Sequence, residues 1–171
     1  MLSRFNKENV KPSPTPLPTW IRLSDIDSPS TDKERELHGK IPYTSIIGSI
    51  MYTMVVTRSD LAYAVGVVSR YISNLGWKHW EAVKHIFRYL RGTEDAQLTF
   101  GLANLTEVEG YTNVDYVGNS DNRKSTSCYI FTYGGGSISW RSRLQECTTL
   151  STTKAEYITS SEEAKEAIWL H

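Results

Sequence analysis

The chain has 171 residues, of which 39% are hydrophobic and 11% aromatic, so it can bury a core in one ordinary domain or two small ones. Its 19 Lys and Arg residues balance 19 Asp and Glu residues, so the overall charge gives no reason to expect nucleic acid, and only the distribution of charge can indicate such a partner. The two cysteines lack zinc-site spacing, and no stretch resembles a membrane span or a signal peptide, so we expect reduced thiols in an intracellular protein, cytoplasmic or nuclear and not secreted.

The N-terminal quarter of the chain is rich in proline. Residues 1–42 contain all six prolines, four of them at alternate positions between Lys11 and Pro18. Alternating proline keeps the backbone extended and without ladder hydrogen bonds, which predicts a linker or strap. A proline-rich ligand for an SH3 or WW domain is the alternative interpretation. Residues 25–40 are polar and charged, and we expect a solvent-facing loop there with a helical turn at 32–38.

Two helical patterns follow the strap. The first begins at Tyr43 and repeats isoleucine and methionine three and four residues apart, which predicts a buried helix. Gly48 within it is expected to let a neighbouring element approach closely. The second helix is expected to have Asp60 as its N-cap and to end at residues 74–76.

The third helical pattern, from Lys78 to Arg91, has one apolar and one basic face, and Gly92 follows where a C-cap glycine is expected. Together the three patterns predict a small helical bundle. The basic face, with Trp77 nearby, is a candidate for contact with phosphates, and an ordinary solvated helix face is the alternative. Its residues are Lys78, Lys84, Arg88 and Arg91.

The last third of the chain predicts three strands and a helix. Residues 108–114, 128–133 and 137–140 are rich in β-formers, and a polar turn and three consecutive glycines separate them, which predicts an antiparallel meander. Ser151 is the expected N-cap of the helix that follows. One stripe of this helix is expected to lie on the sheet, and it consists of Tyr157, Ser161, Ala164 and Ile168.

Seven consecutive motifs resemble one known family. They are KPSPTPL, YTSIIGSIMY, TRSDLAYAV, HWEAVKHIFRYLRGT, GYTNVD, DNRKSTSCYIFTYGGGSISW and LSTTKAEY. In this order they resemble the end of the Pol polyprotein of copia-type LTR retrotransposons, where the last part of reverse transcriptase is followed by the first part of ribonuclease H.

The resemblance implies an α+β fold in three parts. A proline-rich strap or linker covers residues 1–42, and a helical region like the thumb or connection of reverse transcriptase covers residues 43–100. A ribonuclease H-like unit of three antiparallel strands and one helix covers residues 107–171. We expect this unit to be incomplete, because the family places further metal ligands after the position of His171.

The resemblance also implies a chemistry, which is cleavage of the RNA strand of an RNA–DNA hybrid by two metal ions held among clustered carboxylates. The family's first-strand Asp corresponds to Asn113, and its helix Glu corresponds to Glu156, the one metal ligand expected to remain. Asp115 lies about 7 Å further along the strand and is a poor substitute. Because Asn113 is neutral, Mg²⁺, or Mn²⁺ in its place, is expected to bind poorly, and the chain is predicted to be inactive as a nuclease.

Three functions remain open at this point. The chain is a fragment of a hybrid nuclease, a binding module that holds RNA–DNA hybrid without cleaving it, or an inert relic of a decayed element. The relic hypothesis draws on Asn113 and on Lys154, where the family has Asp and Glu, because each change follows from a single G-to-A transition. A second basic cluster is expected beside the hairpin, and it consists of Arg123, Lys124, Arg141 and Arg143. It is expected to contact the phosphates of the same RNA–DNA duplex as the basic face of residues 78–91.

Overall fold

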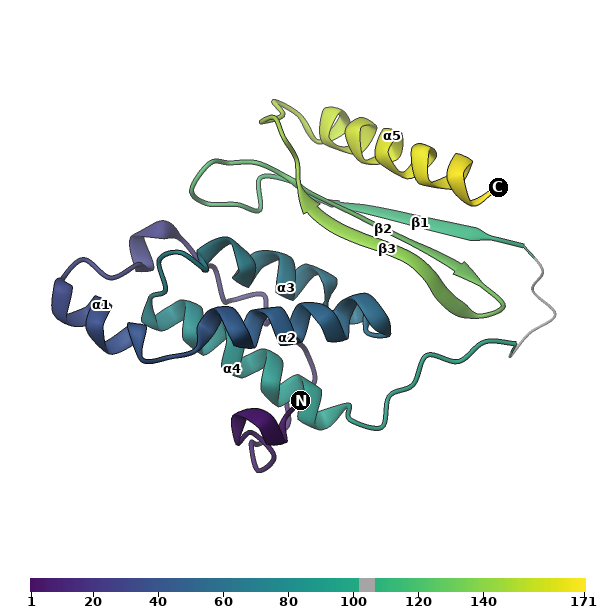
Figure 1. Ribbon diagram of the computed structural model, residues 1–171. Coiled ribbons are helices and arrows are strands. Elements are labelled where there is room, and N and C mark those ends of the chain that lie inside the picture. The colour runs from purple at the N-terminus through teal and green to yellow at the C-terminus, as the bar shows by residue number, and fades with distance from the viewer. Residues whose placement is uncertain (102–106) are drawn as a thin grey trace. The chain divides into compact units, whose positions relative to one another are not determined.

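The computed structural model describes residues 1–101 and 107–171, which divide into two compact units, Met1–Ala96 and Gln97–His171 (Figure 1). The first unit is helical, and the second consists of a three-stranded antiparallel sheet with one helix. The α+β fold class is therefore confirmed. Residues 1–42, expected as a linker or strap, belong to the same unit as the helices that follow them.

In the first unit, apolar side chains of the last three of its four helices, of the segments between these three and of the strap residue Leu23 form one core. The helices are α1 (Asp32–Gly39), α2 (Tyr43–Val56), α3 (Ala62–Val68) and α4 (Trp77–Gly92), with 3-10 turns η1 (Ser3–Phe5), η2 (Asp25–Asp27), η3 (Ser59–Leu61) and η4 (Ser69–Tyr71). The largest fully buried apolar side chains of this core are Ile47, Ile50, Leu61, Val65, Val68, Val83, Ile86 and Phe87.

Helix α2 is buried on one side only, so the expectation of a buried helix was wrong for its other side. Tyr52 and Val55 are 73% and 63% exposed. A Cβ atom added to Gly48 would have nothing within 4 Å among the described residues, so this glycine does not serve a close approach there. The physical reason is that α3 and α4 cover only the face of α2 that carries its isoleucines.

The strap is docked along α4. The backbone N–H of Ser13 donates to the carbonyl of Arg88 at 3.1 Å, and the Nε of Arg88 donates to the carbonyl of Lys11 at 3.0 Å. A Cβ atom on Gly92 would lie 3.2 Å from the Cβ of Pro12. Gly92 is the last residue of α4 and has no positive φ, so the strap's approach, rather than the expected C-cap conformation, is what favours glycine there.

A buried histidine joins the strap to the start of α4. The Nδ1 of His79 accepts from the backbone N–H of Gly76 at 2.9 Å, so its proton lies on Nε2, which donates to the carbonyl of Ser24 at 3.1 Å. The ring stacks on Tyr71 with centroids 4.0 Å apart. The Oγ of Ser28 donates to the carbonyl of Asn74 at 3.0 Å, which adds a second tie between the same two segments.

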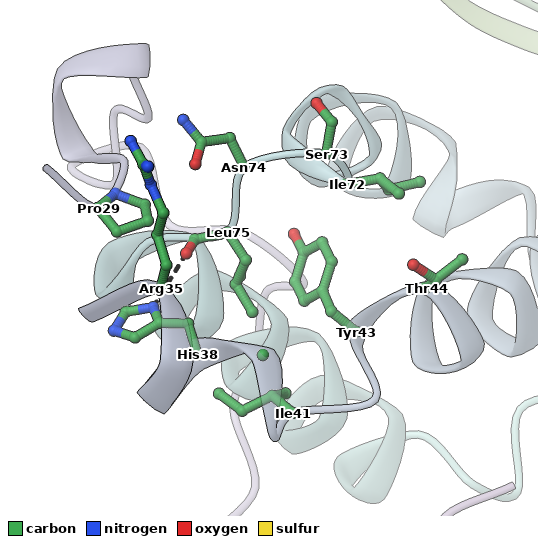
Figure 2. Close-up of a pocket in the computed structure, with 11 residues that line it drawn as sticks. Pro29, Arg35, His38, Ile41, Tyr43, Thr44, Ile72, Ser73, Asn74 and Leu75 are labelled. Carbon is green, nitrogen blue, oxygen red and sulfur yellow. Dashed lines mark hydrogen bonds between the residues drawn. The ribbon is translucent and has the colours of Figure 1, made fainter. Parts of the chain in front are cut away.

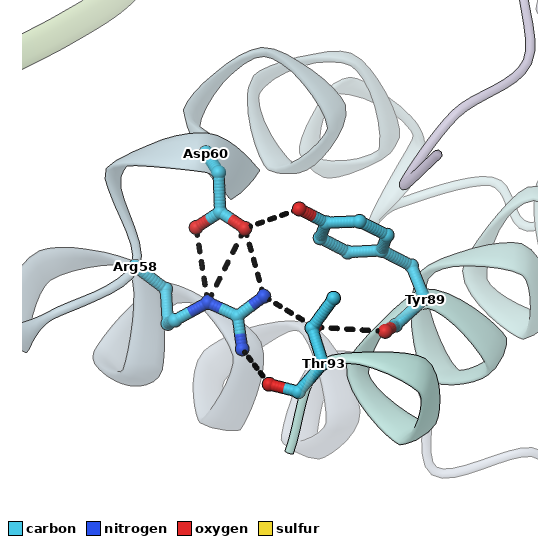
Figure 3. A network of polar contacts seen from close by, with 4 residues as sticks. All are labelled: Arg58, Asp60, Tyr89 and Thr93. Atoms are coloured by element: carbon cyan, nitrogen blue, oxygen red, sulfur yellow. Dashed lines mark hydrogen bonds and ion pairs between the residues drawn. The ribbon is translucent and has the colours of Figure 1, made fainter. Parts of the chain in front are cut away.

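Asp60 does not cap a helix, contrary to the expectation from sequence. It lies in η3, and its carboxylate accepts from the Nε and Nη2 of Arg58, the latter at 2.7 Å, and from the hydroxyl of Tyr89 at 2.7 Å (Figure 3). Arg58 also donates to the carbonyl and the hydroxyl of Thr93. This network ties the α2–α3 connection to the last turn of α4.

The second unit confirms the predicted meander. The strands β1 (Glu109–Asp115), β2 (Thr126–Tyr133) and β3 (Gly136–Leu144) pair in the order β1-β2-β3, with Asn113 opposite Cys128 and Ile130 opposite Trp140. The turn between β2 and β3 uses positive φ at Gly134 and Gly135. The last helix is α5 (Thr152–Leu170), and the Oγ of its N-cap Ser151 accepts from the backbone N–H of Lys154, as expected.

Helix α5 presents a different face to the sheet from the one expected. Ala155 and Thr159 are its buried residues, whereas Tyr157 and Ile168 are 75% and 78% exposed. The predicted stripe was wrong because hydrogen bonds select the face. The hydroxyls of Ser127 and Thr159 are 2.8 Å apart, and the side-chain amide of the buried Gln145 donates to Ser127 and to the carbonyl of Ala155.

Candidate functional site

The residues that the sequence resemblance assigns to a nuclease site lie on β1 and α5. A Cβ atom on Gly110 would lie 2.7 Å from the carboxylate of Glu163, so Gly110 faces α5. Val114 pairs with Ser127, which contacts α5 through Thr159, and therefore faces the same way. Because successive side chains of a strand point to opposite faces, Asn113 points away from α5, the helix that carries Glu156.

Each of the three candidate catalytic residues has its own surroundings. The Oδ1 of Asn113 accepts from the backbone N–H of Val114 at 2.9 Å. The carboxylate of Asp115 folds over its own loop, where it would lie 1.9 Å from a Cβ atom on Gly118. Glu156 is exposed in the second turn of α5. The structure therefore does not bring the three residues into one cluster.

The donor set does not fit a two-metal centre. Two hard divalent ions require several converging carboxylate oxygens. Within residues 1–101 and 107–171, no group of three or more His, Cys, Asp or Glu residues is arranged to hold a metal ion. The position where the resemblance implies Asp carries the neutral Asn113, on the opposite side of the sheet from the helix that carries Glu156.

The four basic residues of α4 are accessible but have local partners. Lys78 pairs with Asp27 at 2.5 Å, Lys84 pairs with Glu81 and Arg91 pairs with Glu94. The fourth, Arg88, donates to the strap carbonyl of Lys11. These pairs are wholly or partly exposed, and ion pairs of this kind contribute only about 0–1 kcal/mol each.

Positive charge gathers where the strap meets α4. Residues 1–22 contain four Lys or Arg residues and one Glu, and α4 likewise contains four Lys or Arg residues and one Glu. Each segment therefore carries a net charge of +3, within a chain whose formal net charge is zero. We call the surface formed by residues 1–22 and α4 the strap–α4 surface.

Two tryptophans are exposed on the strap–α4 surface. Trp20 is 73% exposed and Trp77 is 60% exposed. The Nζ of Lys84 lies 4.7 Å from the ring centroid of Trp77, and the ring of Trp20 meets His85 edge to face with centroids 5.6 Å apart. Burial, followed by the nearby charge of Arg88, lowers the pKa of His85, which favours the neutral imidazole.

The second basic cluster is divided between two places. The Nζ of Lys124 donates to the carbonyl of Glu146 at 2.6 Å, and Arg143 pairs with the carboxylate of the same residue at 3.4 Å. Arg141 instead lies beside Tyr129. Burial and then Glu166 raise the pKa of Tyr129, and Arg141 offsets part of this rise. The remaining member, Arg123, has a positive φ of 56° in the loop before β2.

The exposed side of α2 carries a hollow that sequence reasoning missed. It has a volume of about 650 Å³ and is lined by hydroxyl groups, by the open backbone at Gly48, by Tyr52 and by Arg4. The signal was present as small and hydroxyl residues at every third or fourth position. It was missed because the isoleucine pattern of the same helix dominated. The remaining lining residues are Met1, Ser45, Ser49 and Thr53.

A smaller cavity of about 360 Å³ lies between α1 and the turn before α4 (Figure 2). Figure 2 shows Arg35 and Asn74 at one end of it and Ile41 at the other. The Nδ1 of His38 and the carbonyl of Leu75 are 2.9 Å apart across this region. The contact holds α1 against the bundle, so we assign a structural role to this region.

Comparison with known proteins identifies relatives along nearly the whole chain. It is 53% identical over 170 residues to the retrovirus-related Pol polyprotein from transposon TNT 1-94 of Nicotiana tabacum, and 33% identical over 170 residues to that from transposon RE2 of Arabidopsis thaliana. Each alignment covers 99% of this chain, which spans 13% and 11% of the length of these two relatives.

A third relative is a shorter protein. The chain is 46% identical over 130 residues to the secreted RxLR effector protein 161 of Plasmopara viticola, and the match covers 76% of this chain and 92% of that protein. No family model matches the chain, and no solved structure does. None of the helices described here is both long and apolar enough to span a bilayer. On the strength of the matches to Pol polyproteins, the chain belongs to the family of copia-type retrotransposon Pol polyproteins.

Proposed function

We propose that this chain is the part of a copia-type Pol polyprotein in which the reverse transcriptase thumb region adjoins ribonuclease H, and that it binds RNA–DNA hybrid without cleaving it. The sequence similarity to Pol polyproteins over 99% of the chain supports this placement. Binding is proposed to be independent of nucleotide sequence, because the candidate contacts are to phosphates.

The concentration of charge on the strap–α4 surface is the observation that carries the proposal. Two segments of +3 each are held together by the bonds of Arg88 to Lys11 and Ser13. A nucleic-acid duplex carries closely spaced phosphates, and neutralising them with Lys and Arg releases condensed counterions. A neutral chain with 8 of its 19 Lys and Arg residues and only two Glu residues on one surface fits such a polyanion better than an evenly charged chain would.

The ion pairs of α4 do not prevent this binding. At their side chains Arg91 is 37% exposed and Glu94 is 48% exposed, so water already competes for both members of this pair. Because exposed pairs contribute little, a phosphate can replace Glu94 at small cost. Asp27, the partner of Lys78, is only 12% exposed, so replacing it costs more. Phosphate also accepts charge-assisted hydrogen bonds from Arg in a bidentate manner.

The absence of cleavage is proposed from the donor set. Asn113 supplies a neutral carbonyl oxygen, and it points to the other side of the sheet from the helix that carries Glu156. Without converging carboxylates, the attacking and leaving oxygens of the phosphodiester have no pair of ions to stabilise them. Glu156 alone provides one exposed carboxylate.

A titration of labelled hybrid into the purified chain, with Mg²⁺ and a cleavage readout, tests the proposal. We expect affinity to fall steeply as salt rises, with the RNA strand remaining intact. The double variant Lys84→Gln/Arg88→Gln should lower the salt slope by about 2, whereas Lys165→Gln on α5 should leave it unchanged. Salt-independent binding, or cleavage that is lost in Glu156→Gln, would overturn the proposal. No binding at all would instead favour the inert relic.

A further inference from the structure

The strap–α4 surface combines exposed indole rings with cations, and we propose that Trp20 and Trp77 stack on unpaired bases, so that this surface binds single-stranded nucleic acid. The inference rests on the proposed function, because it concerns the same surface. It adds to the proposed RNA–DNA hybrid a second ligand for this surface, a strand whose bases are accessible.

The rings and the cations lie on two neighbouring sides of α4. Lys84 follows Trp77 by two turns, and its Nζ returns to 4.7 Å from the indole centroid. The next residue, His85, packs against Trp20 of the strap. Arg88 follows one turn later. At 100° per residue, Trp77, Lys84 and Arg88 lie within about 40° of one another around the helix axis, and His85 lies about 60–100° from them.

Exposed indoles on a charged surface indicate an aromatic ligand. Trp20 and Trp77 are 73% and 60% exposed to solvent, although burying a tryptophan side chain is strongly favourable. A base has a π-face that stacks on such a ring whatever its identity, and neighbouring Lys and Arg side chains neutralise the adjoining phosphates. Bases inside a duplex are already stacked on each other, so the ligand that uses these rings is single-stranded.

The rise of α4 sets a minimum length for a ligand that reaches both rings. His85, the contact of Trp20, lies eight positions after Trp77, which is about 12 Å along the helix axis. Stacked nucleotides rise about 3.4 Å each, so a strand that reaches both indoles covers at least about four nucleotides. The cations Lys84 and Arg88 lie within and just beyond this span.

Three ligands of defined chemistry test the inference on the full chain. They are a blunt RNA–DNA hybrid, an oligothymidylate long enough to reach both rings, and an abasic strand of the same length and charge. Fluorescence anisotropy should show the oligothymidylate binding at least about tenfold more tightly than the abasic strand. Trp20→Ala and Trp77→Ala should each weaken oligothymidylate binding by about five- to a hundredfold and leave the abasic strand unaffected.

Two further variants serve as controls. Trp77→Phe keeps an aromatic face and should restore part of the affinity that Trp77→Ala loses. Trp169→Ala removes an indole that is 78% exposed in the other unit and should change nothing.

The outcomes separate this inference from the proposed function. If hybrid binds but oligothymidylate and abasic strand bind equally, the stacking inference is wrong and the proposed function stands. If none of the three ligands binds, both are wrong. A preference for oligothymidylate that survives both alanine variants would overturn the assignment to these two rings.

Discussion

The carbonyl oxygen of Asp27 lies where a side chain at Gly76 would begin, because an ideal Cβ on Gly76 would be 1.8 Å from that oxygen. Gly76 has φ of −104°, so this close approach, not backbone conformation, requires glycine. The strap is therefore held against the start of α4 by main-chain contact, in addition to the hydrogen bonds of His79.

Gly76→Ala should consequently destabilise the first unit. The added methyl group meets backbone, which cannot rotate away as a flexible side chain would, so we expect a loss of at least about 2 kcal/mol. Hydrogen exchange of residues 1–96 would measure it. Gly48→Ala is the matched control, because that Cβ enters open space and alanine favours the helix by about 0.5–1 kcal/mol. Equal effects of the two substitutions would contradict the docked strap.

The Arg58–Asp60 pair should make the first unit sensitive to acid. Burial acts to raise the pKa of Asp60, but hydrogen bonds from Arg58 and Tyr89 outweigh it, and the pKa is lowered from its ordinary 3.8. The folded state thus favours the ionised carboxylate. This contribution is complete above the ordinary pKa and is lost as pH falls through the lower folded-state pKa. Urea denaturation across this acid range should show the decline.

Asp60→Asn should remove that part of the acid dependence. It should also cost about 1–3 kcal/mol at neutral pH, because Arg58, which is 8% exposed, loses its counter-charge. Tyr89→Phe removes only one hydrogen bond to the carboxylate and should cost about 0.5–1.5 kcal/mol. If the acid dependence were the same in Asp60→Asn as in the original chain, another carboxylate would have to be responsible.

The orientation of α5 can be tested with two neighbouring residues. Ala155→Leu adds three carbons where the side chain is fully buried beneath Gln145, so we expect a loss of about 1–3 kcal/mol in the second unit. Tyr157→Ser changes a residue that is 75% exposed and should stay within about 0.5 kcal/mol of the original. Thermal unfolding, monitored by a spectroscopic probe placed in residues 97–171, distinguishes the two variants. The reverse order of effects would restore the stripe expected from sequence.

Val117 is a β-branched residue with a φ of +55°, in the loop between β1 and β2. The left-handed conformation costs an ordinary residue roughly 1–2 kcal/mol, whereas Asn tolerates it. Val117→Asn should therefore stabilise the second unit by about 0.5–1 kcal/mol, measured by chemical denaturation. Val117→Ile keeps the branched Cβ and should bring no gain. A gain in both variants would mean that backbone strain is not the cause.

Local chemistry explains which parts of the fold could be predicted from sequence. The hairpin turn was predicted because Gly134 and Gly135 supply positive φ where L-residues rarely do, and Ser151 was predicted as an N-cap because its hydroxyl acts within its own turn. The start of α2 at Tyr43 followed from the spacing of its isoleucines. Each of these depends on neighbours in sequence.

Contacts between residues distant in sequence explain which features could not be predicted. The face of α5 is selected by Gln145 and Ser127, which lie outside the helix, so its own pattern could not identify it. The strap reads as an independent linker, yet its Lys11 meets Arg88 across the unit. For the same reason, only part of the candidate site could be predicted from the sequence. The basic residues of α4 were predicted, but their proximity to the charged residues of 1–22 depends on the docking of the strap.

The strap–α4 surface is proposed to be the surface by which this chain binds nucleic acid. Amide hydrogen exchange of the full chain, with and without RNA–DNA hybrid at low salt, tests this proposal most directly. We expect added protection to be confined to residues 1–22 and 77–92 and to disappear as salt rises. Protection centred on β1 and α5, around Asn113 and Glu156, would contradict it.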